Sequence, residues 1–231
     1  MAILVINPNN PTGAVYDEKT LKEIASIAGE YDLPLITDEI YDQLTYDKPQ
    51  TPLVRAAKDV PVLGFNGVSK VYLAPGWRVG YAYFHDENGE LEQLRDAMIR
   101  QARIRICINA AAQIASASAL RSDCSYLVDM MKKLRERRDL IHKRLNEIDS
   151  IKTRLPQAAF YIMPSIDMRE RWKNDTEFVK DVLKETGVVF VPGSGFSEEY
   201  GASHFRSVFL PPPETITEAM NRLEGFMTKR E

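Results

Sequence analysis

Residues 3–13 read Ile-Leu-Val-Ile-Asn-Pro-Asn-Asn-Pro-Thr-Gly, and this stretch decides the fold class. Its first four residues form an apolar run without alternation, which is typical of a strand buried on both faces, as in a parallel sheet. The residues that follow are dense in Asn, Pro and Gly, which favour turns. Further along, Leu21, Ile24, Ala25 and Ala28 fall on one face of a predicted helix. A buried strand, a turn and an amphipathic helix predict an α/β fold.

The alternation of strand and helix continues through the first half of the chain. Further strands are predicted at residues 33–37, 62–65 and 79–84. We therefore expect a mostly parallel sheet with flanking helices.

From residue 91 onward the pattern is mainly helical, with a long helix over residues 123–145. The rest mixes strands and helices and predicts a small α+β domain. Its expected strands are residues 159–163, 188–191 and 205–210, and its expected helices are 176–185, closed by Gly187, and 214–229. We place the domain boundary inside the long helix, which gives a large domain of residues 1–137 and a small domain of residues 138–231.

Composition excludes several classes of partner. The 231 residues carry 30 Lys and Arg against 33 Asp and Glu, a net charge of −3, which gives no electrostatic basis for binding nucleic acid or an anionic membrane. The apolar stretches are too short to span a membrane, and no basic secretory signal is present. The two cysteines, Cys107 and Cys124, lack metal-type spacing, which favours a reduced, cytoplasmic protein without a bound metal.

Polar side chains follow the ends of the first three predicted strands. Asn10, Asp38, Tyr41 and Lys70 each come just after such an end. Because the carboxyl ends of parallel strands line the ligand crevice of open α/β sheets, we expect these residues to converge there. Each alone also has a structural interpretation as a turn residue, a helix cap or a solvated charge. Arg206, between apolar neighbours, is by itself more typical of a buried ion pair.

Taken together and in this order, the motifs resemble one family, the fold-type I aminotransferases that use pyridoxal 5′-phosphate (PLP). The motifs are Asn-Pro-Asn-Asn-Pro-Thr-Gly (7–13), Asp-Glu-Ile-Tyr (38–41), Ser-Lys (69–70) with Arg78 eight residues later, Pro-Gln-Ala-Ala-Phe-Tyr (156–161), Val-Pro-Gly-Ser-Gly-Phe (191–196) and Phe-Arg-Ser-Val-Phe-Leu (205–210). Residues 67–81 and 204–212 are particularly similar to archaeal-type alanine aminotransferases.

The resemblance implies a PLP-transferase fold and transamination of an amino acid, L-alanine, with a 2-oxo acid such as 2-oxoglutarate. It also implies a homodimer. Lys70 is implied to bind PLP covalently and then to move the proton between the substrate Cα and the cofactor C4′. Asp38 is implied to pair with the pyridine nitrogen and keep it protonated, because a protonated ring is the better electron sink.

The remaining implied roles concern hydrogen bonds and charge. Tyr41 and Asn10 are implied to bond the phenolic oxygen of PLP, and Ser69 and Arg78 to hold its phosphate. Arg206 is implied to grip the substrate α-carboxylate in a bidentate pair, beside Asn10.

Two positions depart from the family pattern. Gly67 stands where the family often has Ser, three residues before the lysine, and Ala158 stands where it has Gly. The first change removes one phosphate contact.

Length is the larger departure, because chains of the family are nearly twice as long. We expect the sequence to be the C-terminal portion of such an enzyme, without the Gly-rich loop that cradles the phosphate. Three alternatives follow: an active enzyme, an impaired fragment that serves only for binding or assembly, or an enzyme whose N-terminal half comes from a separate chain. Related PLP chemistries such as β-lyases use the same lysine and aspartate and stay open.

Overall fold

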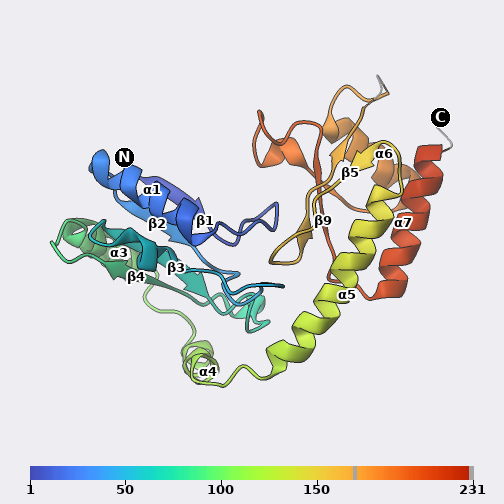
Figure 1. Cartoon of the computed structure of the whole chain (residues 1–231). Helices are drawn as coiled ribbons and strands as arrows, with labels where there is room; N and C mark the ends of the chain where they lie inside the picture. The colour runs from blue at the N-terminus through green and yellow to red at the C-terminus, as the bar shows by residue number, and fades with distance from the viewer. Residues whose placement is uncertain (169–170, 229–231) are drawn as a thin grey trace. The chain divides into compact units, whose positions relative to one another are not determined.

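A computed structural model describes residues 1–168 and 171–228 of the chain. These residues form two compact units (Figure 1). Unit 1 contains Met1–Pro8 and Val15–Leu127, and unit 2 contains Asn9–Ala14 and Val128–Glu231. The units therefore divide inside the long helix α5 (Tyr126–Asn146), as does the predicted boundary after residue 137, which lies further along the same helix.

The sheet of unit 1 has the strand order β1-β2-β3-β4. Strands β1 (Ile3–Ile6), β2 (Leu35–Asp38) and β3 (Val62–Gly67) are parallel, and β4 (Gly80–His85) is antiparallel to β3. The predicted α/β class with a mostly parallel sheet is confirmed, with small shifts at the strand ends.

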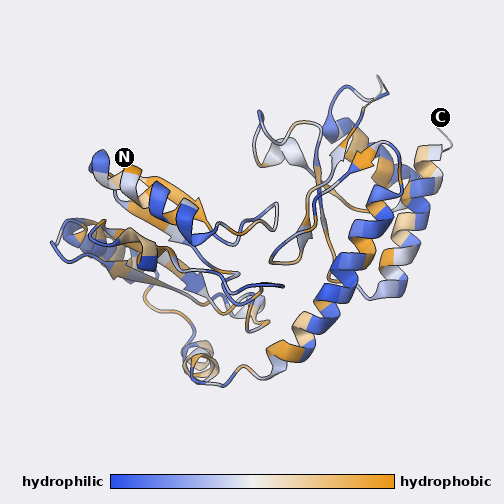
Figure 2. Ribbon diagram, in the orientation of Figure 1, coloured by the Kyte–Doolittle hydropathy of each residue, from blue (hydrophilic) through white to orange (hydrophobic). Residues whose placement is uncertain are grey.

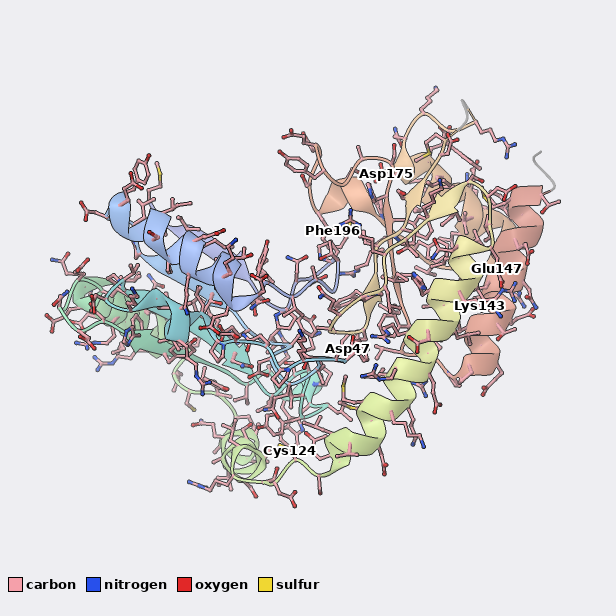
Figure 3. All side chains as sticks on the ribbon, viewed as in Figure 1. Asp47, Cys124, Lys143, Glu147, Asp175 and Phe196 are labelled. Atoms are coloured by element: carbon pink, nitrogen blue, oxygen red, sulfur yellow. The ribbon has the colours of Figure 1, made fainter. Side chains whose placement is uncertain are left out.

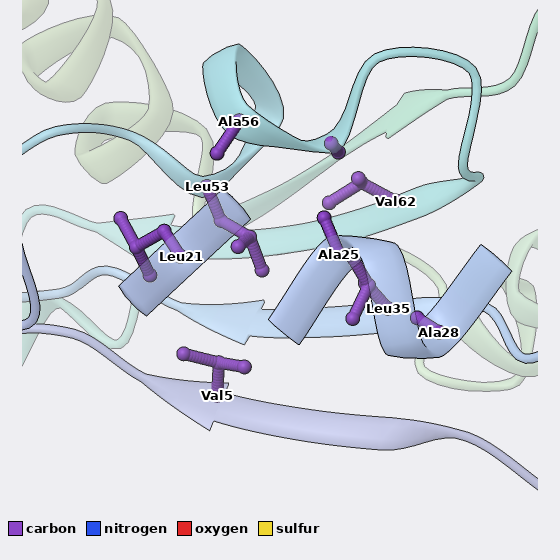
Figure 4. Close-up of a cluster of buried hydrophobic side chains, with 9 residues drawn as sticks. Val5, Leu21, Ala25, Ala28, Leu35, Leu53, Ala56 and Val62 are labelled. Atoms are coloured by element: carbon purple, nitrogen blue, oxygen red, sulfur yellow. The ribbon is translucent and has the colours of Figure 1, made fainter. Parts of the chain in front are cut away.

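Helices α1 (Glu18–Glu30) and α2 (Leu53–Ala57) cover one face of this sheet (Figure 4). Helix α1 begins where Asp17 accepts a hydrogen bond from the Thr20 backbone N–H at 2.8 Å, a standard N-cap. The core between helices and strands consists of buried aliphatic side chains: Val5, Leu21, Ala25, Ala28, Leu35, Leu53, Ala56, Ala57 and Val62. The predicted apolar face of the first helix is thus the face that packs on the sheet.

Unit 1 continues with α3 (Glu92–Ile104), α4 (Ala110–Leu120) and the first two residues of α5. Several large apolar side chains of this region are exposed, among them Ile104, Ile106 and Ile114. The Tyr126 hydroxyl donates to the Val71 carbonyl at 2.7 Å and so fixes the beginning of α5 to the loop after β3. Along α5, hydrophobic bands interrupt long hydrophilic stretches (Figure 2).

Unit 2 combines α5 with α6 (Asp175–Thr186), α7 (Pro213–Thr228) and short antiparallel strands. The strands are β5 (Ile151–Lys152), β6 (Tyr161–Ile162), β7 (Ser165–Ile166), β8 (Val191–Pro192) and β9 (Phe205–Val208), arranged as sheets β5-β7 and β6-β9-β8. The predicted α+β character is confirmed. Helix α6 ends at Gly187 in the left-handed conformation, as predicted.

Three strand predictions in unit 2 were wrong in extent. The predicted strand at 205–210 ends at Val208, the last residue of β9. The predicted strand at 188–191 contains pairing only at Val191, and residues 188–190 are irregular. Phe190 is nevertheless buried, with its ring 4.6 Å from that of Phe205, so side-chain packing explains the apolar run. The predicted strand at 159–163 shortens to β6. The predicted last helix ends at residue 229, which lies outside the described residues.

Residues 9–14 belong to unit 2, although the residues directly before and after them belong to unit 1. Hydrogen bonds hold this excursion of the chain in each unit. In unit 1, Asn7 Oδ1 accepts from the Tyr16 N–H at 3.0 Å, which closes the base of the excursion. In unit 2, the Gly13 carbonyl accepts from the N–H groups of Gln157 and Ala158, both at 2.9 Å. Gly13 has φ +69°, and a Cβ there would lie 2.7 Å from the Pro156 Cβ, so only glycine fits this position.

Candidate active site

Asp38 is the last residue of β2, at the edge of the sheet where β3 also ends. Its side chain is half-buried, and Oδ1 accepts from the Ile40 N–H at 3.1 Å. Among the described residues Oδ2 has no hydrogen-bond donor. One carboxylate oxygen is therefore available to a ligand at the carboxyl edge of the sheet.

Lys70 and Tyr41 lie together at the same edge. The Lys70 Nζ is 5.7 Å from the centroid of the Tyr41 ring, within the range of a cation–π contact. Tyr41 is buried and Lys70 is half-buried. The loop that carries Lys70 is closed by two backbone bonds, from the Leu73 N–H to the Lys70 carbonyl and from the Ala74 N–H to the Val68 carbonyl, each at 3.2 Å.

Ser69 and Arg78 share the loop of Lys70 but are not joined. Ser69 is half-buried, directly before Lys70. Arg78 is exposed, and its Nη1 donates to the Pro75 carbonyl at 2.9 Å, across the short helix η1 (Pro75–Trp77). No hydrogen bond links Arg78 to Ser69 in the described part of the chain. The predicted binding of a phosphate by Ser69 and Arg78 does not require a contact between them and stays a prediction.

Gly67 has a packing reason to differ from the family pattern. A Cβ at this position would lie 2.8 Å from the Val79 carbonyl oxygen and 3.0 Å from the Gly80 Cα. Since β3 and β4 approach this closely at their ends, a serine side chain would require the β4 end to move.

A buried carboxylate next to Asp38 was missed by the sequence reasoning. Glu39 Oε1 accepts from the Leu53 N–H at 2.8 Å and from Thr37 Oγ1 at 3.3 Å. Its Oε2 accepts from the Tyr83 hydroxyl at 3.3 Å. Burial raises the pKa of Glu39, and burial together with the Glu39 charge raises the pKa of Tyr83. The signal was present in the sequence, because Thr37 and Glu39 continue the buried face of β2.

A second half-buried acid, Asp42, lies three residues after Glu39 in the chain. Asp42 Oδ2 accepts from Asn66 Nδ2 at 3.0 Å, and burial raises the pKa of Asp42. Burial and the neighbouring Cys124 raise the pKa of Tyr72 to about 12.

The remaining predicted site residues, Asn10 and Arg206, lie together in unit 2. Arg206 is half-buried on β9, and its Nη1 donates to Asn10 Oδ1 at 2.8 Å. Its guanidinium carbon is 4.5 Å from the Tyr161 ring centroid and 4.7 Å from that of Phe196. The Arg206 Nε is buried and has no hydrogen-bond partner among the described residues. A buried N–H without a partner, on a guanidinium that carries further N–H donors, is suited to bind an anion.

Comparison with known proteins identifies the class. The family "Aminotransferase class I and II" matches residues 1–223. The chain therefore belongs to the class I and II aminotransferases, a family of PLP-dependent enzymes with the fold-type I architecture.

Individual relatives carry aminotransferase names. A probable aspartate aminotransferase of Methanocaldococcus jannaschii is 34% identical over 220 residues, which cover 94% of this chain and 56% of the relative. The glutamate-pyruvate aminotransferase AlaA of Escherichia coli K12 is 32% identical over 98% of this chain and 56% of its own length. The chain thus spans a little over half the length of these relatives.

Solved structures agree in fold. The alanine aminotransferase from Pyrococcus furiosus superimposes with a TM-score of 0.95 at 57% identity, covering 99% of this chain and 57% of that one. An aminotransferase from Escherichia coli gives a TM-score of 0.91 at 31% identity, covering 98% of this chain and 57% of that one.

The donor set of unit 1 fits PLP. Asp38 offers an open carboxylate oxygen as an acceptor for the ring nitrogen. Lys70 offers an amine as a nucleophile for the aldehyde, and Tyr41 offers a phenol as a donor to the phenolic oxygen. Within the described residues, no cluster of three or more His, Cys, Asp or Glu side chains is placed to hold a metal ion. Nor is any described helix both long and apolar enough to cross a membrane.

Proposed function

We propose that this chain carries the lysine and the carboxylate-binding arginine of a PLP-dependent aminotransferase, and that its reaction moves the amino group of L-alanine to a 2-oxo acid such as 2-oxoglutarate. One observation carries the proposal: Lys70 lies against Tyr41 at the sheet edge where β2 ends in Asp38. The family match over residues 1–223 supports the reaction type.

Lys70 is the group that would hold PLP covalently and move the proton. PLP, when bound, supplies an electron sink for the negative charge that forms at the substrate Cα. The Lys70 amine would take the proton from the substrate Cα as a base and deliver it to the cofactor C4′ as an acid. The ring of Tyr41 below Nζ limits the positions open to the amine, so this contact orients it.

Asp38 would keep the cofactor ring protonated. Its Oδ1 is oriented by the Ile40 N–H, which directs the other oxygen toward a ligand. A carboxylate next to a ring nitrogen favours the protonated nitrogen by charge attraction.

The hydroxyl of Tyr41 and the amide of Asn10 would donate to the phenolic oxygen of PLP, and Ser69 and Arg78 would hold its phosphate. For Arg78, this role requires its guanidinium to exchange the Pro75 carbonyl for a phosphate oxygen, a stronger acceptor. Arg206 would bind the substrate α-carboxylate, with Asn10 holding one end of its guanidinium.

Relatives' names support alanine as the amino donor. The Pyrococcus furiosus structure is titled an alanine aminotransferase, and the Escherichia coli relative is named a glutamate-pyruvate aminotransferase. Other relatives are named for aspartate and aromatic amino acids. Members of the family therefore differ in amino donor, and alanine is our proposal for this chain. We further propose a homodimer acting in the cytoplasm on free amino and 2-oxo acids.

A second candidate follows from length. Because the chain matches only 56% to 58% of its first relatives, it is alternatively an impaired piece that binds PLP weakly, or one that needs a separate N-terminal chain. Purification of the active enzyme with a second polypeptide would favour that last form.

Trapping PLP on the chain tests the proposal. The folded chain is mixed with PLP, reduced with borohydride and digested, and mass spectrometry is expected to find the cofactor on the peptide of Lys70. The variant Lys70→Ala should lose this adduct and the visible absorbance band, whereas Lys58→Ala, an exposed lysine of the same unit, should keep both. Labelling of exposed lysines alone would contradict the proposal. Turnover of L-alanine and 2-oxoglutarate then separates the enzyme from the impaired piece.

A further inference from the structure

The guanidinium of Arg206 makes cation–π contacts with two aromatic rings. Its carbon is 4.5 Å from the ring centroid of Tyr161 on β6 and 4.7 Å from that of Phe196, the residue after the short helix η2 (Gly193–Gly195). Both distances fall within the range of cation–π contacts. We expect rings at this distance to cover the faces of the planar guanidinium and to leave its edges to an anion.

The nitrogen atoms of the guanidinium differ in their hydrogen bonding. Nη1 donates to Asn10, and Nε is buried without a partner among the described residues. An anion that binds here must therefore accept hydrogen bonds in the plane of the guanidinium. A carboxylate does this with both oxygens, because it is planar and matches the fork.

A tetrahedral oxyanion does not fit the same plane. When two oxygens of a phosphonate or sulfonate lie on the fork, a third must project out of the plane, toward a ring. The face of an aromatic ring is negatively polarised and repels an oxyanion. We propose that Tyr161 and Phe196 are specificity-determining residues that make Arg206 select planar carboxylates over tetrahedral oxyanions; this deepens, and rests on, the proposed binding of an α-carboxylate at Arg206.

The turn that carries Phe196 is built to hold its ring in place. Asp175, only 2% exposed, accepts from the Ser194 N–H at 2.6 Å, and the Phe196 N–H donates to the Gly193 carbonyl at 2.9 Å. A side chain on Gly193 would collide with the Gly201 carbonyl. Figure 3 labels both ends of this arrangement, Asp175 at the beginning of α6 and Phe196 on the turn. The buried carboxylate thus acts on Arg206 through Phe196, as a positioning residue.

Phe196 can be changed with little risk to folding, because 37% of its surface is exposed, whereas Tyr161 is 6% exposed. Phe196→Leu removes the ring and keeps an apolar side chain. Phe196→Tyr restores a ring. The matched control is Phe190→Leu, which removes a ring that packs on Phe205 and not on Arg206.

The experiment titrates the full chain with acetate, methylphosphonate and methanesulfonate while following the arginine Nε–H signals by ¹⁵N NMR. Arg206→Lys assigns the signal of Arg206, and the exposed Arg222, paired with Glu218, is an internal reference. Acetate is expected to bind about tenfold more tightly than either tetrahedral anion, a ratio of the size that one cation–π contact supplies. Phe196→Leu should bring the ratio close to one, and Phe196→Tyr and Phe190→Leu should keep it.

An unchanged ratio in folded Phe196→Leu would overturn the inference, and so would a wild-type Arg206 signal that does not respond to acetate. The titration contains no PLP and reads unit 2, whereas the proposed function is read by the adduct at Lys70 in unit 1. A chain that selects acetate but never binds PLP therefore contradicts the proposed function and supports the selectivity. A chain that binds PLP at Lys70 but does not select acetate supports the proposed function and contradicts the selectivity.

Discussion

Arg206 Nη1 donates to Asn10 Oδ1 at 2.8 Å, which joins residues 196 positions apart in the sequence within one unit. The contact predicts effects of different size for two substitutions. In Asn10→Asp the new carboxylate would pair with Arg206 and compete with a ligand carboxylate, so the Kd for acetate should rise by about tenfold or more. Asn10→Ala frees Nη1 and should change that Kd by less than about threefold. The Arg206 Nε–H titration measures both, and equal effects would show that the contact does not orient the guanidinium.

Glu39 is predicted to support the fold through its acceptors. Glu39→Ala would leave the Leu53 N–H and the Tyr83 hydroxyl without a partner, at a cost of about 1–3 kcal/mol for each donor that stays buried. Glu39→Gln keeps the shape and an acceptor and should cost less. Urea unfolding measures the free energies, with Glu30→Gln at the exposed end of α1 as the control. Equal losses for the alanine and glutamine variants would contradict this account.

The same residue predicts a pH dependence. Because burial raises the pKa of Glu39 above its ordinary 4.5, the folded state holds this proton more tightly than the unfolded state. That contribution to stability is present below the ordinary pKa and is lost as the pH rises through the raised folded-state value. Relative to the wild type, Glu39→Gln should therefore gain stability as the pH rises from about 4 to about 8. A stability difference that stays constant across this range would contradict the prediction.

Gly64 is predicted to be required by the ring of Tyr83. A Cβ at Gly64 would overlap this ring, which lies across β3 to reach Glu39. Gly64→Ala should cost about 1–3 kcal/mol in the free energy of unfolding, as overpacking does in a core. Tyr83→Leu, which shortens the side chain, should reduce that cost in the double variant. Gly225→Ala is the control, because it has open space in α7 and should stabilise the helix by about 0.5–1 kcal/mol.

Gly67→Ser restores the family's more frequent residue and is predicted to harm the fold. Its Cβ would press on the Val79 carbonyl at the junction of β3 and β4. The midpoint of thermal unfolding should fall, and PLP binding at Lys70 should not improve. Stronger PLP binding with unchanged stability would show that the lost hydroxyl contact matters more than the close approach of the strands.

The local pattern of apolar residues was sufficient to predict most strands and the first helix of unit 1. The apolar runs at β1, β2 and β3 and the face of Leu21, Ala25 and Ala28 predicted the strands and the helix, because parallel strands and amphipathic helices bury regular sets of side chains. The same pattern failed at residues 188–190, where an apolar run is buried by side-chain packing without backbone pairing.

The site was predictable in residue type but not in contact. The order of motifs singled out Lys70, Tyr41, Asn10 and Arg206. The contacts of Lys70 with Tyr41 and of Asn10 with Arg206 come from the structure. The rings on Arg206 were missed even though Tyr161 and Phe196 end two of the quoted motifs, because their meeting depends on the turn that Asp175 holds and on strand pairing far apart in sequence. The local pattern of apolar and polar residues does not predict a contact of this kind.

The excursion of residues 9–14 means that neither unit is a continuous stretch of chain. A cut of the polypeptide between residues 127 and 128 would leave the second piece without the turn that carries Asn10. Arg206 would lose its partner, and the Gly13 carbonyl would no longer accept hydrogen bonds from Gln157 and Ala158. The two units consequently cannot be exchanged between proteins by a single crossover in the gene. Any recombination event that preserves both must retain the first fourteen residues together with the C-terminal half, which couples the inheritance of the lysine-bearing sheet to that of the arginine site.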